Sequence, residues 1–347
     1  MADLHQRKEI EPIHFIIGPG RSGTTLLMML LNNHQDLIAS PVIKHILFFY
    51  EKYKSCIRFN HEIKTEFINY FRELKAASLN PMFQFDENKI YDIKENLSFA
   101  DFCIEIHKVL HFNKPVKAII DKNPFYTQHI DKLLDIYPQA KFIFLVRDYR
   151  GFIHSHLNST HTFQKKRNVR FYASSWHVYV SNYLKLSEAD KRKFLLVKME
   201  DFLNSPEKSL QEICSFLQVE FDDKIFDYTI KIEEHLNSYR DLKENYPRLF
   251  KKMTDLLRPI SGENVYNWKK NLLVGEIKNA KVICGKLGEQ IGYKTTTTVS
   301  SYQKLNVLFW NFPWYISVNT YFVLVGVKSH HYLNIKRRIE FKKNTIK

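Results

Sequence analysis

Short apolar runs alternate with longer, more polar or amphipathic stretches between residues 14 and 217. The longer stretches exceed the usual length of a strand, and two of them have a proline in their first turn, a position that helices tolerate. The predicted strands cover residues 14–18, 115–121, 141–146 and 193–202, and the predicted helices cover residues 22–34, 123–138, 147–159 and 205–217. Strands that alternate with helices favour parallel pairing through right-handed crossovers. The pattern therefore predicts an α/β fold, a three-layer sandwich with a central parallel sheet.

A run of threonines at 295–298 separates a main domain, residues 1–294, from a C-terminal extension, residues 295–347. Residues 305–327 carry no charge and are long enough to span a bilayer, while residues 328–347 are strongly basic. Because basic segments tend to stay on the cytoplasmic side, a span would put the main domain on the opposite side. We therefore expect the extension to pack on the main domain or to lie in a membrane interface, with three aromatic residues at headgroup level: Trp310, Trp314 and Tyr315.

The composition indicates a globular protein that attracts anions. Of 347 residues 44% are hydrophobic, and 52 Lys and Arg against 37 Asp and Glu give a net charge of +15. Such a charge favours nucleotides, acidic glycans, nucleic acid or anionic lipid as partners. The first residues are polar, the four cysteines form no C-x-x-C pair, and the histidines lack the usual spacing of metal ligands. We therefore expect a cytoplasmic protein without a metal, either free or at the cytoplasmic membrane surface.

A glycine-rich loop, G-P-G-R-S-G-T-T, joins the first predicted strand to its helix. The spacing from Gly18 to Gly23 fits a phosphate-binding loop, but Thr24 stands where a nucleoside triphosphatase has lysine. The amides of residues 21–25 would converge on an anion at the positive end of the helix. Side-chain donors are added by four residues: Arg21, Ser22, Thr24 and Thr25. The loop therefore predicts an anion site that works without the usual lysine.

A second candidate site follows the predicted strand at 141–146. Arg147 precedes Asp148 where a triphosphatase would end its strand in a metal-holding acid, which favours an anion held without metal. Ser155 lies eight residues after Arg147, slightly over two helical turns, so both side chains can face the same side. A guanidinium and a hydroxyl can together bind one phosphate. Because ligands of parallel sheets bind at the carboxyl ends of strands, both loops are expected at one edge.

Together these motifs resemble the sulfotransferases that use 3′-phosphoadenosine 5′-phosphosulfate (PAPS). The resemblance runs from about residue 13 to 293 and rests on five stretches: GPGRSGTTLL, DKNP at 121–124, FIFLVRDYRGFIHSHL, LLVKMEDFLNSPEKSLQEICSFLQV and NVYNWKKNL. DKNP is similar to the D-K-T-P of the tyrosylprotein and related glycan sulfotransferases, so the resemblance is closer to that branch. It implies a P-loop-like sulfotransferase fold, PAPS as co-substrate and no metal.

The resemblance implies a role for each matching residue. The 5′-phosphosulfate would be bound by the first loop: Gly20, Arg21, Ser22, Gly23, Thr24 and Thr25. The 3′-phosphate would be bound by Arg147 and Ser155. Lys122, with Arg21, would stabilise the transferring sulfuryl group and the leaving oxygen, because in-line transfer spreads negative charge over these oxygens. The implied acceptor is a hydroxyl of a glycan, a lipid or a small molecule.

The sequence departs from the family at several positions. The tyrosine that would contact adenine is replaced by Met199, and a second arginine of the tyrosylprotein enzymes falls on Ser159. The family's catalytic base, a histidine or a glutamate, would align near Pro124 or at Val42, so neither base is present. His45 is the nearby side chain best suited to replace it, because histidine has an ordinary pKa near neutrality. Two neighbours are the alternatives: Lys44 and Glu51.

Three functions of different classes stay open on the sequence. The first is a PAPS-dependent sulfotransferase. The second is a P-loop kinase or nucleoside triphosphatase, against which the missing lysine and metal acid weigh. The third is a non-catalytic nucleotide-binding or membrane-docking relative, which the missing base favours. No recognised nucleic-acid module accompanies the net charge of +15, so no nucleic-acid partner is expected.

Overall fold

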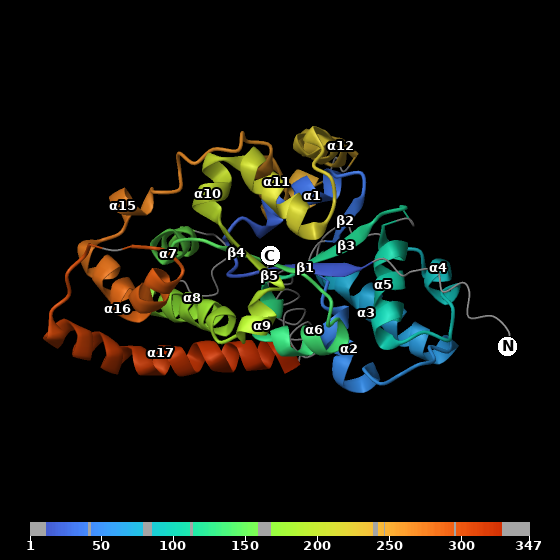
Figure 1. The fold of residues 1–347 in the computed structure, drawn as a ribbon, viewed down its shortest axis with the longest axis horizontal. Coiled ribbons are helices and arrows are strands. Elements are labelled where there is room, and N and C mark those ends of the chain that lie inside the picture. Colours follow the sequence, from blue (N-terminus) through green and yellow to red (C-terminus); the bar gives the residue numbers. More distant parts are fainter. Residues whose placement is uncertain are drawn as a thin grey trace.

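Parallel strands form the centre of the molecule in the computed structural model, which describes residues 12–40, 43–78, 85–111, 114–158, 168–238, 242–245, 247–294 and 296–327. Within these residues the sheet has five strands: β1 (Ile13–Ile17), β2 (Leu37–Ser40), β3 (Ala118–Lys122), β4 (Phe142–Val146) and β5 (Phe194–Lys198). Their order is β2-β3-β1-β4-β5, and neighbouring strands pair in parallel. The central strand β1 therefore lies between β3 and β4 (Figure 1).

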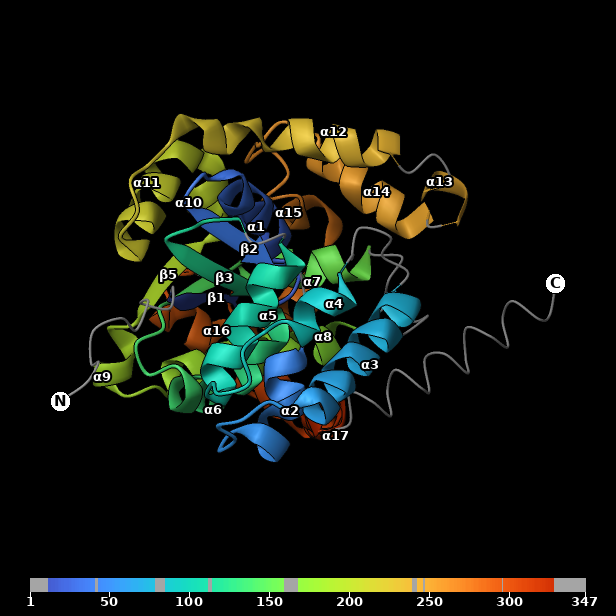
Figure 2. The ribbon, with the colours of Figure 1, turned by 90° about the vertical axis from the view of Figure 1, so that its right-hand side faces the viewer.

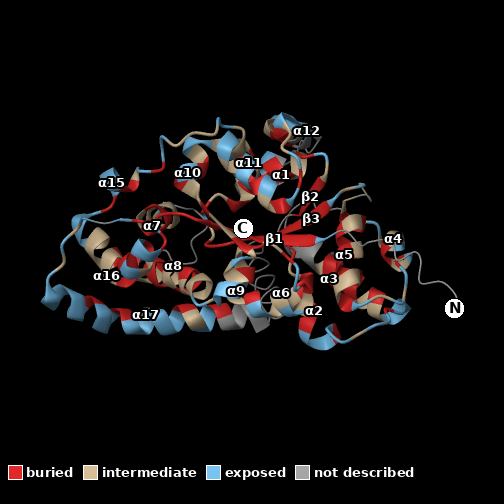
Figure 3. Ribbon diagram, in the orientation of Figure 1, coloured by how far each residue is buried: buried red, intermediate tan, exposed pale blue. Residues whose placement is uncertain are grey.

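The strands are nearly continuous apolar runs because both faces of the sheet are covered. Alternate side chains of β1 point to opposite faces, so Phe15 and Ile17 belong to one hydrophobic cluster and Ile16 belongs to another. Strands β1 to β4 are buried along their whole length, while three residues of the edge strand β5 are half-buried. Figure 3 shows the exposed residues mainly on the outer sides of the helices. The predicted three-layer sandwich around a parallel sheet is confirmed.

Helices from distant parts of the chain cover the two faces (Figures 1 and 2). The face that contains Ile16 is covered by α1 (Thr24–Asn33), α10 (Met199–Asn204), α11 (Pro206–Leu217), α12 (Tyr228–Ser238) and α14 (Pro247–Leu256). The face that contains Phe15 is covered by α2 (His45–Tyr53), α3 (His61–Ser78), α5 (Phe99–Leu110), α6 (Ile130–Ile136), α7 (Tyr149–Leu157), α8 (Val169–Leu184) and α16 (Val274–Gln290). Shorter helices are α4 (Glu87–Tyr91), α9 (Glu188–Lys191), α13 (Leu242–Asn245), α15 (Trp268–Asn271) and the 3₁₀ turns η1 (Pro124–Gln128) and η2 (Asp223–Asp227).

Two predicted elements take a different form in the structure, and one strand of the sheet was not predicted. The strand predicted to reach residue 202 ends at Lys198 and continues directly as α10. The helix predicted over residues 123–138 is divided into η1 and α6, because the Asn123 side chain accepts a hydrogen bond from the Phe125 amide and caps a separate 3₁₀ turn (3.1 Å). The edge strand β2 was not predicted, since its four residues are too few to give a periodic signal.

The C-terminal extension contains a long helix, α17 (Ser301–Val327), that packs along α8. Val318 and Phe322 pack against Val178 and Tyr179 of α8. Figure 1 shows α17 along the lower edge of the molecule, beneath α16 and α8. Of the two placements expected for the extension, these residues adopt the packed one, and residues 328–347 lie outside the described residues. No helix in the described part of the chain is long and apolar enough to cross a membrane.

Candidate functional site

Three basic residues follow the carboxyl ends of three neighbouring strands. Lys122 ends β3 and pairs in register with Ile16 of β1, Arg21 lies in the loop after β1, and Arg147 follows β4. Because β3, β1 and β4 are adjacent, these residues share one edge of the sheet, where parallel sheets bind their ligands. Lys122 is only 4% exposed and Arg147 only 8% exposed, so both charges are largely removed from water. Both loops predicted to bind an anion therefore lie at the same edge.

The loop between β1 and α1 has a backbone that requires glycine. Gly18 has a φ of +124°, and a Cβ at this residue would lie 2.2 Å from the Leu145 carbonyl oxygen. Gly23, directly before α1, has a φ of +89°. Arg21 adopts a φ of +67° although it carries a side chain, a conformation that costs free energy. The Gly18 amide donates a hydrogen bond to the Thr127 hydroxyl (2.8 Å), which fixes the loop to η1.

The side chains of this loop include a buried donor that no group in the described part of the chain satisfies. The Ser22 hydroxyl is fully buried and has no hydrogen-bond partner among the described residues. Thr24 is buried as well, and Thr25 is half-buried. Gly20 faces open space, since a Cβ there would have no neighbour within 4 Å. A buried hydroxyl without a partner costs free energy, which a ligand with acceptor oxygens would recover.

Arg21 connects the first loop to the second. Its Nε donates a hydrogen bond to the Ser155 hydroxyl on α7 (3.3 Å), so the predicted 5′ and 3′ sites are in direct contact. Met199 also lies beside the first loop, because a Cβ at Gly23 would be 3.6 Å from its Cγ. Met199, the position that the resemblance assigns to an adenine-contacting tyrosine, therefore lies next to the loop.

The Arg147 guanidinium is held in a buried position without complete hydrogen bonding. Its Nε has no partner among the described residues. Burial lowers the pKa of this guanidinium, the nearby Glu200 and Asp148 carboxyls oppose that change, and the positive charge of Arg21 adds to it. Gly151 leaves space for the side chain, since a Cβ at Gly151 would lie 2.7 Å from the Arg147 Nε. Two arginines of like charge beside an unpartnered donor indicate a site for an anion.

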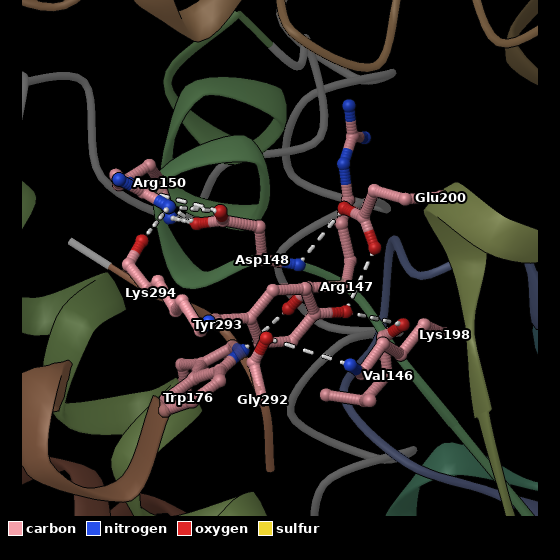
Figure 4. A network of polar contacts seen from close by, with 10 residues as sticks. All are labelled: Val146, Arg147, Asp148, Arg150, Trp176, Lys198, Glu200, Gly292, Tyr293 and Lys294. Atoms are coloured by element: carbon pink, nitrogen blue, oxygen red, sulfur yellow. Dashed lines mark hydrogen bonds and ion pairs between the residues drawn. The ribbon is translucent and has the colours of Figure 1, made fainter. Parts of the chain in front are cut away.

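A network of polar contacts holds the backbone at Arg147 (Figure 4). The Glu200 carboxylate accepts from the Asp148 amide (3.0 Å) and from the Tyr293 hydroxyl (2.7 Å), and that hydroxyl is also 3.3 Å from the Val146 carbonyl oxygen. Burial raises the pKa of Glu200, and the hydrogen bonds from Tyr293 and Asp148 oppose this rise. The end of β4 is thereby tied to α10 and to the segment after α16.

Further contacts reinforce the same network. The Arg150 Nε donates to Asp148 Oδ1 (2.9 Å), and the Arg150 guanidinium lies over the Trp268 ring, 4.2 Å from its centroid. The Trp176 indole donates to the Arg147 carbonyl oxygen (2.9 Å). Trp268 belongs to the NVYNWKKNL stretch, so this late motif supports the second loop from outside. Sequence reasoning missed Thr127, Trp176 and Tyr293, because no motif marks a contact between residues so far apart in the chain.

His156 is another residue that sequence reasoning missed. Its ring stacks on the Tyr172 ring, with 4.8 Å between the centroids. Burial lowers the pKa of His156 to about 3, and the nearby Arg21 charge acts in the same direction. The imidazole is therefore neutral at physiological pH and packs against the anion site without adding charge to it.

His45, the candidate base, lies inside the core. Its side chain has no exposed surface, and neither ring nitrogen has a hydrogen-bond partner among the described residues. Burial lowers the pKa of His45 well below its ordinary value, and His107, whose ring centroid is 4.8 Å away, adds to the effect. The ring is thus neutral, but it is enclosed in this conformation. Its role as a base stays a prediction that this placement does not support.

The alternative bases are engaged elsewhere. The Lys44 ammonium lies over the Phe125 ring, 4.8 Å from its centroid. Glu51 forms an exposed ion pair with Lys132.

Two family positions, Val42 and Ser159, lie outside the described residues. Among the described residues, no group of three or more His, Cys, Asp or Glu side chains could hold a metal ion.

Comparison with known proteins places these residues in a family. The model of the sulfotransferase family matches residues 12–223, which include both loops and Lys122. The protein-tyrosine sulfotransferase of Drosophila melanogaster is 25% identical over 74% of this chain and 47% of its own length, so the chain matches about half of that relative. The protein-tyrosine sulfotransferase 1 of Danio rerio is 23% identical over 81% of this chain and 72% of its own length.

Other relatives differ in what their names describe. The omega-hydroxy-beta-dihydromenaquinone-9 sulfotransferase Stf3 of Mycobacterium tuberculosis is 27% identical over 68% of this chain and 69% of its own length. Among solved structures, the sulfotransferase domain from the Synechococcus PCC 7002 olefin synthase has a TM-score of 0.44 and 22% identity, covering 88% of this chain and 97% of that one.

The close packing at Gly18 generates a stability prediction. We expect Gly18→Ala to lower the free energy of unfolding by roughly 2–5 kcal/mol, because the new Cβ meets a carbonyl oxygen and the backbone conformation disfavours a side chain. Gly20→Ala is the matched control, since nothing lies within 4 Å of its added Cβ, and we expect a change within about 0.5 kcal/mol. Urea unfolding of both variants measures the difference. Equal losses would show that the loop does not have this backbone.

The contact between Tyr293 and Glu200 generates a prediction that depends on pH. Tyr293→Phe removes a donor from a buried carboxyl and should cost about 1–3 kcal/mol of stability. Burial raises the pKa of Glu200. The carboxyl is protonated below this raised pKa and ionised above it. The lost donor matters more to the ionised form, so the destabilisation should grow from pH 5 to pH 8.

Urea unfolding across this pH range tests the Tyr293 prediction. Tyr302→Phe is the matched control, since Tyr302 is 77% exposed, and it should change stability little at any pH. A loss for Tyr293→Phe that stays constant with pH would mean that the hydroxyl does not serve the Glu200 carboxylate.

Proposed function

Because this chain belongs to the sulfotransferase family, we propose that it transfers a sulfuryl group from PAPS to a hydroxyl of an acceptor. The observation that carries the proposal is the set of buried donors at one sheet edge. Within the described ranges of the chain, the Ser22 hydroxyl and the Arg147 Nε have no hydrogen-bond partner, and Arg21 lies between the two sites. These groups fit a ligand with two anionic ends.

The residues of the two loops fit PAPS in their chemistry as well as in offering two anion sites. Every candidate donor in the two loops is a cation, a hydroxyl or a backbone amide, which suits phosphate and sulfate oxygens. The loop Gly20–Thr25 would hold the 5′-phosphosulfate, and Arg147 with Ser155 would hold the 3′-phosphate. Met199 would contact adenine through its polarisable thioether. PAPS, when bound, supplies an activated sulfuryl group.

Lys122 and Arg21 would serve the transfer step. Lys122 is nearly buried at the end of β3, next to the strand that leads into the loop. An ammonium fixed in a site of low polarity stabilises negative charge that develops on nearby oxygens more strongly than it would in water. Arg21 would act on the same oxygens from the loop. These two cations are therefore proposed to lower the barrier, whereas Arg147 is proposed to bind.

The acceptor is proposed to be a hydroxyl on a glycan, a lipid or a small molecule. The names of relatives include both a protein-tyrosine sulfotransferase and an omega-hydroxy-menaquinone sulfotransferase. Both substrates carry a hydroxyl, one on a protein and one on a lipid.

We assign no catalytic base, because His45 is enclosed in the core. We also propose a cytoplasmic location, at or near the membrane surface; the described cysteines are all free thiols.

A second candidate function is nucleotide binding without transfer. The enclosed position of His45 favours it, since the alternative bases Lys44 and Glu51 are each engaged by another side chain. A radiolabelled PAPS assay with a tyrosine peptide, a long-chain alcohol and a glycan as acceptors distinguishes the two functions. Transfer to any of these acceptors supports the enzyme, and tight nucleotide binding without transfer to any supports the second candidate.

The two-loop site generates a binding prediction. Adenosine 3′,5′-bisphosphate should bind without magnesium and more tightly than 5′-AMP, because only the former has a 3′-phosphate for Arg147. Arg147→Ala should weaken its binding by about 1.5–3 kcal/mol, the size of a charge-assisted hydrogen bond. Calorimetry in the presence of a chelator measures both effects. Arg258→Ala, at an arginine with a 76% exposed side chain, is the control. Equal affinity for both nucleotides would contradict the 3′-phosphate site.

The buried lysine generates a prediction about turnover. Lys122→Ala should lower kcat by roughly 10²–10³-fold, as the loss of a preorganised charge does in other active sites, and leave the affinity for adenosine 3′,5′-bisphosphate nearly unchanged. Lys117→Ala is the matched control, because Lys117 directly precedes β3 but has a 62% exposed side chain paired with Asp36. Steady-state kinetics with the best acceptor gives the comparison. Unchanged turnover in Lys122→Ala would remove Lys122 from the mechanism.

A further inference from the structure

The helix α17 has apolar side chains on two opposite sides. Each residue of an α-helix advances 100° around the axis, so positions spaced by three, four and seven residues form a stripe. The inner stripe consists of Val307, Asn311, Trp314, Val318 and Phe322. The outer stripe lies opposite and consists of Leu305, Phe309, Phe312 and Ile316. A helix that is apolar on both sides requires an apolar neighbour on both sides.

The inner stripe already has its neighbour. Phe322 contacts Tyr179 edge to face, with 5.1 Å between ring centroids, and Trp314 contacts Phe171 at 6.4 Å. Asn311, the polar member of the stripe, accepts a hydrogen bond from the Ser174 hydroxyl (3.1 Å). The side of α17 that faces α8 is therefore fixed to the main domain, and the helix lies flat along it.

The outer stripe faces water in the isolated chain. Its four side chains are between 49% and 74% exposed. Trp310 and Tyr315, which are 56% and 40% exposed, lie on the two flanks of the helix, between the outer and the inner stripe. Large exposed apolar surfaces of this kind are uncommon on soluble monomers and mark contact with another apolar surface. Figure 3 shows the side of α17 turned away from α8 as exposed along most of its length.

We infer that the outer stripe of α17 docks on the surface of an anionic lipid bilayer. The leucine, isoleucine and phenylalanine side chains would enter the acyl boundary, and the tryptophan and tyrosine on the flanks would lie at headgroup level, where such rings are favoured. Residues 328–347, which directly follow α17 in the sequence, carry seven Lys and Arg and one Glu. This charge complements anionic headgroups.

The charge also favours lipid over a second copy of the chain as the occupant. Two chains paired through α17 would bring together two net charges of +15 and two basic C-terminal segments. Such a dimer would be opposed by repulsion, whereas an anionic bilayer is attracted to the same charges. Residues 305–327 contain no charge of either sign that could form ion pairs across a dimer.

Vesicle flotation with the full chain tests this inference. The protein should float with vesicles of phosphatidylcholine and phosphatidylserine, much less with phosphatidylcholine alone, and less at high ionic strength because salt screens the basic residues. The double variant Phe309→Ser/Phe312→Ser should bind at least about tenfold more weakly, since two exposed rings no longer enter the bilayer. Ile230→Ser is the matched control; Ile230 is 55% exposed on α12, on the other side of the sheet, and its loss should leave binding unchanged.

Two further measurements keep the result interpretable. Circular dichroism melting of the double variant should match the unsubstituted protein, because the two rings lie on the exposed side. Brominated lipids should quench part of the tryptophan fluorescence of the unsubstituted protein, which has four tryptophans, and Trp310→Phe should remove most of that quenching. The inference is overturned by absence of flotation with both vesicle types, by unchanged binding of the double variant, or by retention that resists carbonate extraction. Concentration-dependent dimers that the double variant abolishes, without flotation, would assign the stripe to a second copy.

Discussion

The burial of the Arg147 guanidinium is the constraint on which the arrangement of the site depends. A charged group removed from water costs several kcal/mol unless its surroundings compensate. Around Arg147, the electrostatic attraction of nearby carboxylates compensates for burial more than hydrogen bonds to the guanidinium do. Glu200 and Asp148 lie close enough to oppose the fall of its pKa, yet their carboxylates accept hydrogen bonds from Tyr293, Arg150 and the Asp148 amide. The acids therefore stabilise the charge while leaving one donor of Arg147 without an acceptor among the residues that the structure describes.

The same constraint explains why distant segments meet behind β4. Tyr293, from the segment after α16, closes on Glu200 at the start of α10. Gly151 leaves the volume that the arginine side chain occupies. The first loop is fixed through Gly18, which lies close to Leu145 of β4 and bonds to Thr127. Each loop thus has supporting contacts with the main domain, and the hydrogen bond from Arg21 to Ser155 joins the two loops directly.

The sheet could be predicted from the sequence because strands buried on both faces are uninterrupted apolar runs, as in FIFLV of β4. The loops could be predicted because local spacing specifies them: the glycines set the backbone of the first, and the helix that begins after Arg147 carries Ser155, whose hydroxyl contacts Arg21. The Tyr293 contact could not be predicted, since its partner lies 93 residues away and pairing at that distance leaves no local pattern. The burial of His45 could not be predicted for a related reason. A histidine among aromatic residues has the same sequence pattern in a core as in a pocket, and only the packing of α5 against α2, which brings His107 to His45, separates the two.

The helix α8 touches both the tail helix and the anion site. Ser174 bonds to Asn311 on one side, and two residues later Trp176 bonds to the Arg147 carbonyl oxygen on the other. One helix therefore carries both contacts, and a displacement of α8 that strengthens one contact also affects the other. Such a coupling is reciprocal. If binding of a partner to the α17 face changes the anion affinity at Arg147 by some factor, anion binding changes the affinity of the α17 face for that partner by the same factor. The two ends of this coupling can be measured separately and must agree.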